Sequence, residues 1–83
     1  MDVEQQVRQF LVNNSRWQGP VSGLTTDYLL IENEVLDSMA IFETVAFLED
    51  QFGIEVQDDD LVPENFATIG AIARLVSNNQ NRE

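Results

Sequence analysis

The spacing of apolar residues in segment 37–52 restricts the fold of this chain more than any other feature. Steps of about 100° per residue, as in an α-helix, bring four large apolar side chains onto one narrow face. These residues are Ile41, Val45, Leu48 and Phe52. Gly53 follows as a suitable C-terminal stop, and either Asp37 or Ser38 can cap the N-terminus with its side-chain oxygen. The segment therefore predicts a strongly amphipathic helix that buries one face in a core.

Two further segments have apolar residues at helical spacing. The first covers residues 2–14, where the carboxylates of Asp2 and Glu4 suit the positive end of the helix dipole. The second follows Thr68, which can cap it, and is expected to end at about Ser77. The predicted buried stripes are Val3, Val7, Phe10 and Leu11 in the first helix and Ile69, Ile72, Ala73 and Val76 in the second.

The connections between these helices differ in character. Residues 16–33 combine turn signals with scattered large apolar residues, which predicts a long loop pinned to the core. Residues 54–56 alternate but are too few to support a sheet, and Pro63 can occupy the first turn of a short helix. The polar tail, residues 78–83, is expected to fray. We therefore predict an all-α bundle of four helices, with a short third helix and a long first loop.

The size of the chain and the residue types it lacks restrict its chemistry. Its 83 residues predict one domain, residues 1–83, ordered over about 2–78. Cysteine is absent, so neither a disulfide framework nor a thiolate metal site can support the fold. Histidine and lysine are absent as well, which removes most of the usual catalytic bases and nucleophiles. The acidic run 58–60 lacks the spacing and central glycine of a calcium-binding loop. We expect neither an enzyme nor a metal site.

Acidic side chains dominate the charge. Fifteen Asp and Glu residues against four arginines give a net charge of −11, and no basic residue lies between Arg16 and Arg74. Such a field repels nucleic acid and anionic membranes, and it attracts basic protein partners most strongly at low salt. Solubility alone is the alternative explanation. Without a signal peptide or a long apolar run, we expect a cytoplasmic protein, and a monomer.

Ser38 lies where the long loop meets the most amphipathic helix. A serine at this position can act simply as a helix cap. Alternatively, its hydroxyl is exposed at the helix N-terminus, where a phosphate ester would meet free backbone amides and the favourable end of the dipole. The residues alone leave both interpretations open.

Three segments, in order along the chain, resemble the acyl carrier protein family, which includes peptidyl and aminoacyl carriers. Residues 36–39, Leu-Asp-Ser-Met, resemble the Asp-Ser-Leu attachment motif of that family. Residues 48–56 resemble the end of its second helix, and residues 63–69 resemble its Phe-x-Thr entry into the last helix. Many carriers have a glycine shortly before the Asp-Ser pair, whereas residues 33–36 of this chain contain none. Met39 replaces the usual leucine, which conserves volume.

The resemblance implies a prosthetic group and a set of partners. Ser38 would carry 4′-phosphopantetheine, transferred from coenzyme A by a phosphopantetheinyl transferase, and Asp37 would assist recognition or metal contact during transfer. The thiol of this arm would hold an acyl or aminoacyl group as a thioester, so the chain would be a substrate of partner enzymes. The acidic second helix would face basic patches on the loading enzyme and on the downstream transferase or synthase. The residues expected at this surface are Met39, Phe42, Glu43, Ala46 and Glu49.

The type of carrier is a separate prediction. Residues 52–56 and 63–66 look like those of discrete carriers in specialised pathways, which predicts a freestanding carrier in a polyketide or nonribosomal type of natural-product pathway. Residues 35–39 also resemble the D-alanyl carrier of teichoic acid modification, which is the second interpretation. A third is an acidic protein-interaction module in which Ser38 is never modified.

Overall fold

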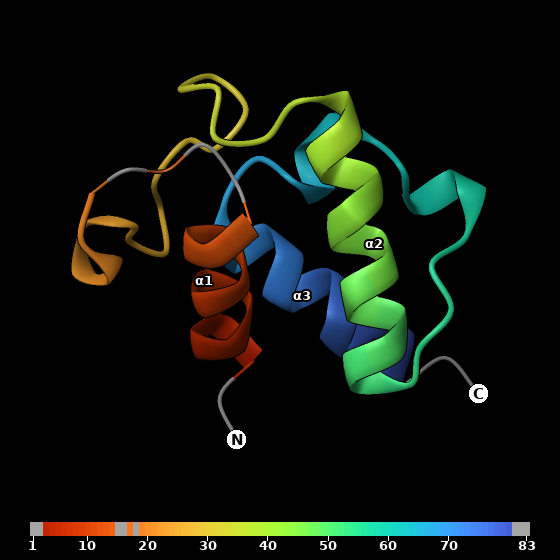
Figure 1. Cartoon of the computed structure of the whole chain (residues 1–83). Helices are drawn as coiled ribbons and strands as arrows, with labels where there is room; N and C mark the ends of the chain where they lie inside the picture. The colour runs from red at the N-terminus through yellow and green to blue at the C-terminus, as the bar shows by residue number, and fades with distance from the viewer. Residues whose placement is uncertain (1–2, 15–16, 18, 81–83) are drawn as a thin grey trace.

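The computed structural model describes residues 3–14, 17 and 19–80, and this part of the chain contains helices and turns but no strand. Its α-helices are α1 (Val3–Asn14), α2 (Ser38–Phe52) and α3 (Ile69–Gln80), with short 3-10 turns at Val21–Gly23 (η1), Asp58–Asp60 (η2) and Pro63–Asn65 (η3). Helices α1 and α2 run in opposite directions, and α3 crosses behind them (Figure 1). The all-α class is confirmed. The count of four helices is not, because the expected short third helix is only the 3-10 turn η3.

The first helix matches its predicted extent over the described residues, and Asp2 lies outside them. None of the helices that the structure describes has the length and apolar character needed to cross a membrane.

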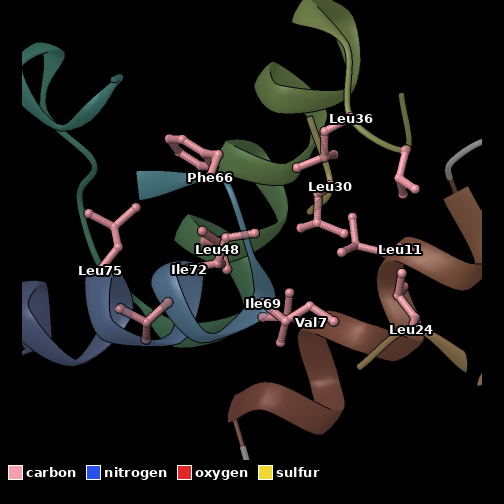
Figure 2. Packing of buried hydrophobic residues seen from close by; sticks show 12 residues of the cluster. Val7, Leu11, Leu24, Leu30, Leu36, Leu48, Phe66, Ile69, Ile72 and Leu75 are labelled. Carbon is pink, nitrogen blue, oxygen red and sulfur yellow. The ribbon is translucent and has the colours of Figure 1, made fainter. Parts of the chain in front are cut away.

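The core draws on all three helices and on the loop between α1 and α2. In the view of Figure 2, the side chain of Leu30 lies between those of Leu48 and Leu11, and Leu36 lies next to it. The buried apolar residues are Val7, Leu11, Leu24, Leu30, Val35, Leu36, Leu48, Phe66, Ile69, Ile72, Leu75 and Val76. Burying a side chain of this size contributes about 1.5–3 kcal/mol each, so the loop residues are an integral part of the fold.

Backbone hydrogen bonds fasten the long loop to the segment that leads into α3. The amide of Leu30 donates to the carbonyl of Ala67 at 2.8 Å, and the amide of Gly70 donates to the carbonyl of Thr26 at 3.1 Å. These bonds join residues far apart in the sequence, so the loop is held at both its middle and its later part. The prediction of a loop pinned to the core is confirmed.

The buried face of α2 differs from the predicted one. Leu48 is fully buried, as predicted, whereas the other three residues of that face are only half buried. Thr44 is fully buried as well, and sequence patterning missed it because threonine is polar. Its hydroxyl donates to the carbonyl of Ala40 at 2.7 Å, so the polar group is satisfied within the helix and tolerates burial.

Helix α3 begins as predicted and ends later than predicted. The hydroxyl of Thr68 accepts a hydrogen bond from the amide of Ala71 at 3.0 Å, which confirms the cap. The helix continues past Ser77 to Gln80, and Asn79 is only 8% exposed. The expected fraying from residue 78 is therefore wrong for residues 78–80, because packing of the last turn holds it helical. Residues 81–83 lie outside the described part.

Candidate functional site

Asp37, and not Ser38, caps α2. The backbone of Asp37 is extended, and its carboxylate accepts a hydrogen bond from the amide of Ala40 at 2.9 Å. Ser38 is the first residue of the helix, and it is exposed. Ser38 is therefore not the cap of α2, because that role belongs to its neighbour Asp37. The serine hydroxyl is available for other chemistry.

The first turn of α2 presents free donors beside this hydroxyl. Helices leave their first amides without an intrahelical acceptor, and here the amides of Ser38 and Met39 find none among the described residues. The helix dipole adds positive character at the same end. An anionic group attached to Ser38 would therefore have backbone amides beside it that attract it, and not only carboxylates that repel it.

The loop before α2 is tightly turned without the help of glycine. The amides of Val35 and Leu36 both donate to the carbonyl of Leu30, at 2.8 and 3.2 Å. Glu34 makes the turn possible by adopting the left-handed conformation, with φ of 62°. This conformation costs a residue with a Cβ atom roughly 1–2 kcal/mol, and glycine avoids the cost. The absence of a glycine before the Asp-Ser pair is therefore compensated by a strained glutamate.

An open groove with a volume of about 520 Å³ adjoins Ser38. Its walls come from the loop before α2, from α2 and from the segment that runs from the end of η2 to the start of η3. The lining residues are Ile31, Glu34, Leu36, Asp37, Ser38, Ile41, Phe42, Leu61 and Pro63. Most of this lining is apolar, and the volume lies in the range of small-molecule sites. Sequence reasoning missed the groove, because its walls come from two segments distant in sequence, 31–42 and 61–63.

The outer surface of α2 presents large apolar side chains beside the groove. Met39 is 71% exposed and Phe42 is 63% exposed, and Glu43 and Ala46 are exposed as well. Clusters of exposed apolar residues with charged neighbours are typical of protein interaction sites. The predicted contact residues on the first turns of α2 are therefore accessible, and their role as a partner surface stays a prediction.

Glu49, the last of the predicted contact residues, is in a different environment. It is half buried, and its carboxylate accepts a hydrogen bond from the amide of Val56 at 2.9 Å. This bond fastens the chain after α2 back onto the helix. Sequence reasoning treated Glu49 as a surface charge, and it could not find this contact because no local pattern indicates it.

The acidic run 58–60 forms the turn η2. The carboxylate of Asp60 accepts a hydrogen bond from the amide of Gln57 at 3.2 Å, and the side chain of Gln57 completes a reciprocal cap. Within residues 3–14 and 19–80, no group of three or more potential ligands is placed to hold a metal ion. The carboxylate of Asp60 thus has a structural contact that closes the turn.

Together these features define a small all-helical protein that presents one exposed serine at the start of a helix, beside an apolar groove. No family model matches the chain. Over 58 residues the chain is 34% identical to a protein described as "Probable acyl carrier protein PigG" from Serratia sp. (strain ATCC 39006). The matched region is 70% of this chain and 67% of that protein. The chain belongs to the acyl carrier protein family, as its motifs predict, and its role is that of a carrier.

Proposed function

We propose that this chain carries a 4′-phosphopantetheine arm on Ser38 and holds an acyl or aminoacyl intermediate on that arm as a thioester. The observation that supports this most strongly is the exposure of Ser38 at the start of α2, with the capping role taken by Asp37. When bound, the arm supplies a thiol, a group that this sequence lacks because it contains no cysteine.

The residues around Ser38 fit such an arm. The serine hydroxyl is exposed, so a transferase can reach it. The amides of Ser38 and Met39 can donate to the phosphate, which offsets its repulsion by nearby carboxylates. The side chain of Asp37 is held in place by its hydrogen bond to Ala40, next to the position where the transferase would act. In this proposal Asp37 assists recognition or metal contact during transfer.

Partner enzymes dock on α2 in this proposal. They are the phosphopantetheinyl transferase, the loading enzyme and a downstream transferase or synthase with basic docking patches. Met39 and Phe42 supply an apolar contact, and Glu43 supplies charge that speeds association with a basic partner. Ala46 widens the accessible surface, and Glu49 contributes charge at its far end. The chain is a cytoplasmic monomer that catalyses no reaction itself and binds neither nucleic acid nor membrane.

The proposed setting is a polyketide or nonribosomal type of natural-product pathway, with the chain as a freestanding carrier. Residues 52–56 and 63–66 support it through their resemblance to discrete carriers of specialised pathways. Residues 35–39 favour the second candidate, a D-alanyl carrier of teichoic acid modification. The third candidate is an acidic interaction module with an unmodified Ser38.

Intact-protein mass spectrometry tests the proposal. The purified chain is incubated with coenzyme A and a broad-specificity phosphopantetheinyl transferase, and a mass gain of one phosphopantetheine is expected. Ser38→Ala should abolish the gain without unfolding the helix, because the cap at Asp37 is unchanged. Ser77→Ala, at an exposed serine of α3, should retain it. A folded wild-type chain that gains no mass beside an active transferase control would leave the unmodified module as the better explanation.

A further inference from the structure

Glu34 stands out among the residues around the groove. It is one of two acidic residues in the lining, and the other, Asp37, is engaged as the cap of α2. The carboxylate of Glu34 makes no hydrogen bond or ion pair with any other residue that the structure describes. Its charge is therefore available to a molecule in the groove.

The backbone holds Glu34 at this position. Its amide donates to the carbonyl of Ile31 at 3.1 Å, and the next amide, that of Val35, donates to the carbonyl of Leu30 at 2.8 Å. Leu30 is fully buried, so the turn is anchored in the core. The left-handed conformation of Glu34 would suit glycine better, which means that the chain keeps a charged side chain here at a cost in stability.

The lining favours one class of ligand over the others. Six of its residues are apolar, its charged residues are both acidic, and neither Arg8 nor Arg74 belongs to it. An apolar acyl body can bury surface there. A cationic end would be attracted to Glu34, whereas a carboxylate end would be repelled by it and by the acidic field of the chain.

We propose that Glu34 selects cargo by charge, so that the groove binds acyl groups that carry a protonated amine and disfavours those that carry a free carboxylate. This inference rests on the proposed arm at Ser38. Ser38 itself lines the groove, so a flexible arm attached there begins at the groove and can fold back into it. A short flexible tether gives an effective concentration in about the millimolar range, so weak contacts are sufficient to populate the folded-back state.

The test compares three cargoes of matched length on the intact chain. A phosphopantetheinyl transferase loads arms that end in 4-aminobutanoyl, pentanoyl or glutaryl groups, each joined through a stable amide, and intact mass verifies loading. The backbone amide signals of Ile31 and Leu61, which line the groove from two distant parts of the chain, then report the folded-back population by nuclear magnetic resonance. We expect this population to be about two- to five-fold higher for 4-aminobutanoyl than for glutaryl, because one exposed charge pair contributes modestly.

Variants isolate the role of Glu34. Glu34→Gln should remove the difference between the two charged cargoes and leave the pentanoyl signals unchanged. Glu34→Gly removes the carboxylate while suiting the left-handed backbone, and it should do the same. Glu32→Gln is the matched control, since Glu32 is exposed on the same loop but does not line the groove. It should keep the difference.

Three results would overturn the inference while leaving the carrier proposal intact. The first is equal signals for 4-aminobutanoyl and glutaryl arms, and the second is an unchanged difference in both Glu34 variants. The third is an equal loss of the difference in Glu32→Gln, which would indicate general charge rather than Glu34. A chain that gains no arm at all on Ser38 would overturn both proposals.

Discussion

The turn before α2 and the turn after it each contain one residue in the left-handed conformation, but the two turns use different residue types. Glu34, shortly before the helix, and Gly53, directly after it, both adopt the left-handed conformation, with φ of 62° and 64°. After the helix the chain uses glycine, the residue that suits this conformation. Before the helix it uses glutamate, at the edge of the groove beside Ser38. The difference indicates that the turn after the helix has the residue best suited to its backbone, whereas the turn before it keeps the charged side chain of Glu34 despite the strain.

Packing shows the same contrast. Near the C-terminal end of α2, Phe47 stacks on Phe10 of α1 with ring centroids 4.2 Å apart and meets Phe52 edge-on at 6.1 Å. At the N-terminal end, Met39 and Phe42 are more than half exposed. Large apolar side chains thus pack against one another near the C-terminal end, where they are half buried, and are left in solvent at the end that bears Ser38. The comparison teaches that the helix is anchored through one end and offers the other for contact.

The largest expected effect comes from breaking the anchored part of the helix. Leu48→Ala removes a fully buried side chain and should lower the free energy of unfolding by about 2–5 kcal/mol. Met39→Ala, at a residue 71% exposed, should change it by less than about 0.5 kcal/mol. Urea unfolding followed by circular dichroism measures both. Equal losses in the two variants would contradict the division of α2 into an anchored and an exposed end.

The next effect concerns the glycine after the helix. A Cβ atom at Gly53 would meet no atom within 4 Å, so the cost of Gly53→Ala comes from the backbone conformation alone. We expect a loss of about 1–2 kcal/mol in unfolding free energy. Gly53→Asn should lose less, since asparagine tolerates the left-handed region better. If alanine and asparagine are equally well tolerated in thermal unfolding, the turn does not depend on that conformation.

Replacing the left-handed residue before the helix, Glu34, with glycine should raise the free energy of unfolding rather than lower it. Glu34→Gly relieves the left-handed strain and adds flexibility to the unfolded chain, so the net stabilisation should be about 0.5–1 kcal/mol. Urea unfolding beside Glu32→Gly, where the backbone does not require glycine, provides the control. A destabilised Glu34→Gly variant would mean that the glutamate side chain supports the fold, and the contrast between the two turns would lose its basis.

The smallest expected effect is kinetic. Glu43→Arg at the exposed end of α2 should slow transfer of phosphopantetheine to Ser38 by about two- to ten-fold at low salt, because the partner surface is expected to be basic. Asp50→Arg makes the same change in net charge on the same face of the helix, about two turns farther from Ser38. Initial rates of mass gain compare them. Equal slowing would indicate that only net charge matters. Glu49 is less suitable, since its substitution also breaks the bond to Val56.

Local sequence was sufficient for much of the fold. Apolar spacing predicted the three long helices, and Gly53 and Thr68 were correctly identified as a stop and a cap. These signals work because helix formation and capping depend on residues within a few positions of one another. The Asp-Ser pair also indicated the family, which the similarity to a probable acyl carrier protein confirmed.

Tertiary structure decided what depends on distant contacts. It buried Thr44, extended α3 to Gln80 and reduced the expected short helix to the turn η3.

The candidate functional site was likewise determined in part by the sequence and in part by the tertiary structure. The sequence determined that an Asp-Ser pair begins an amphipathic helix in an acidic, cysteine-free chain. Only the folded structure decided that Asp37 takes the cap, that Ser38 is exposed, and that Glu34 lines a groove with Leu61. The physical reason is that a cap candidate is visible in a few neighbouring residues, whereas a groove exists only once segments distant in sequence pack together.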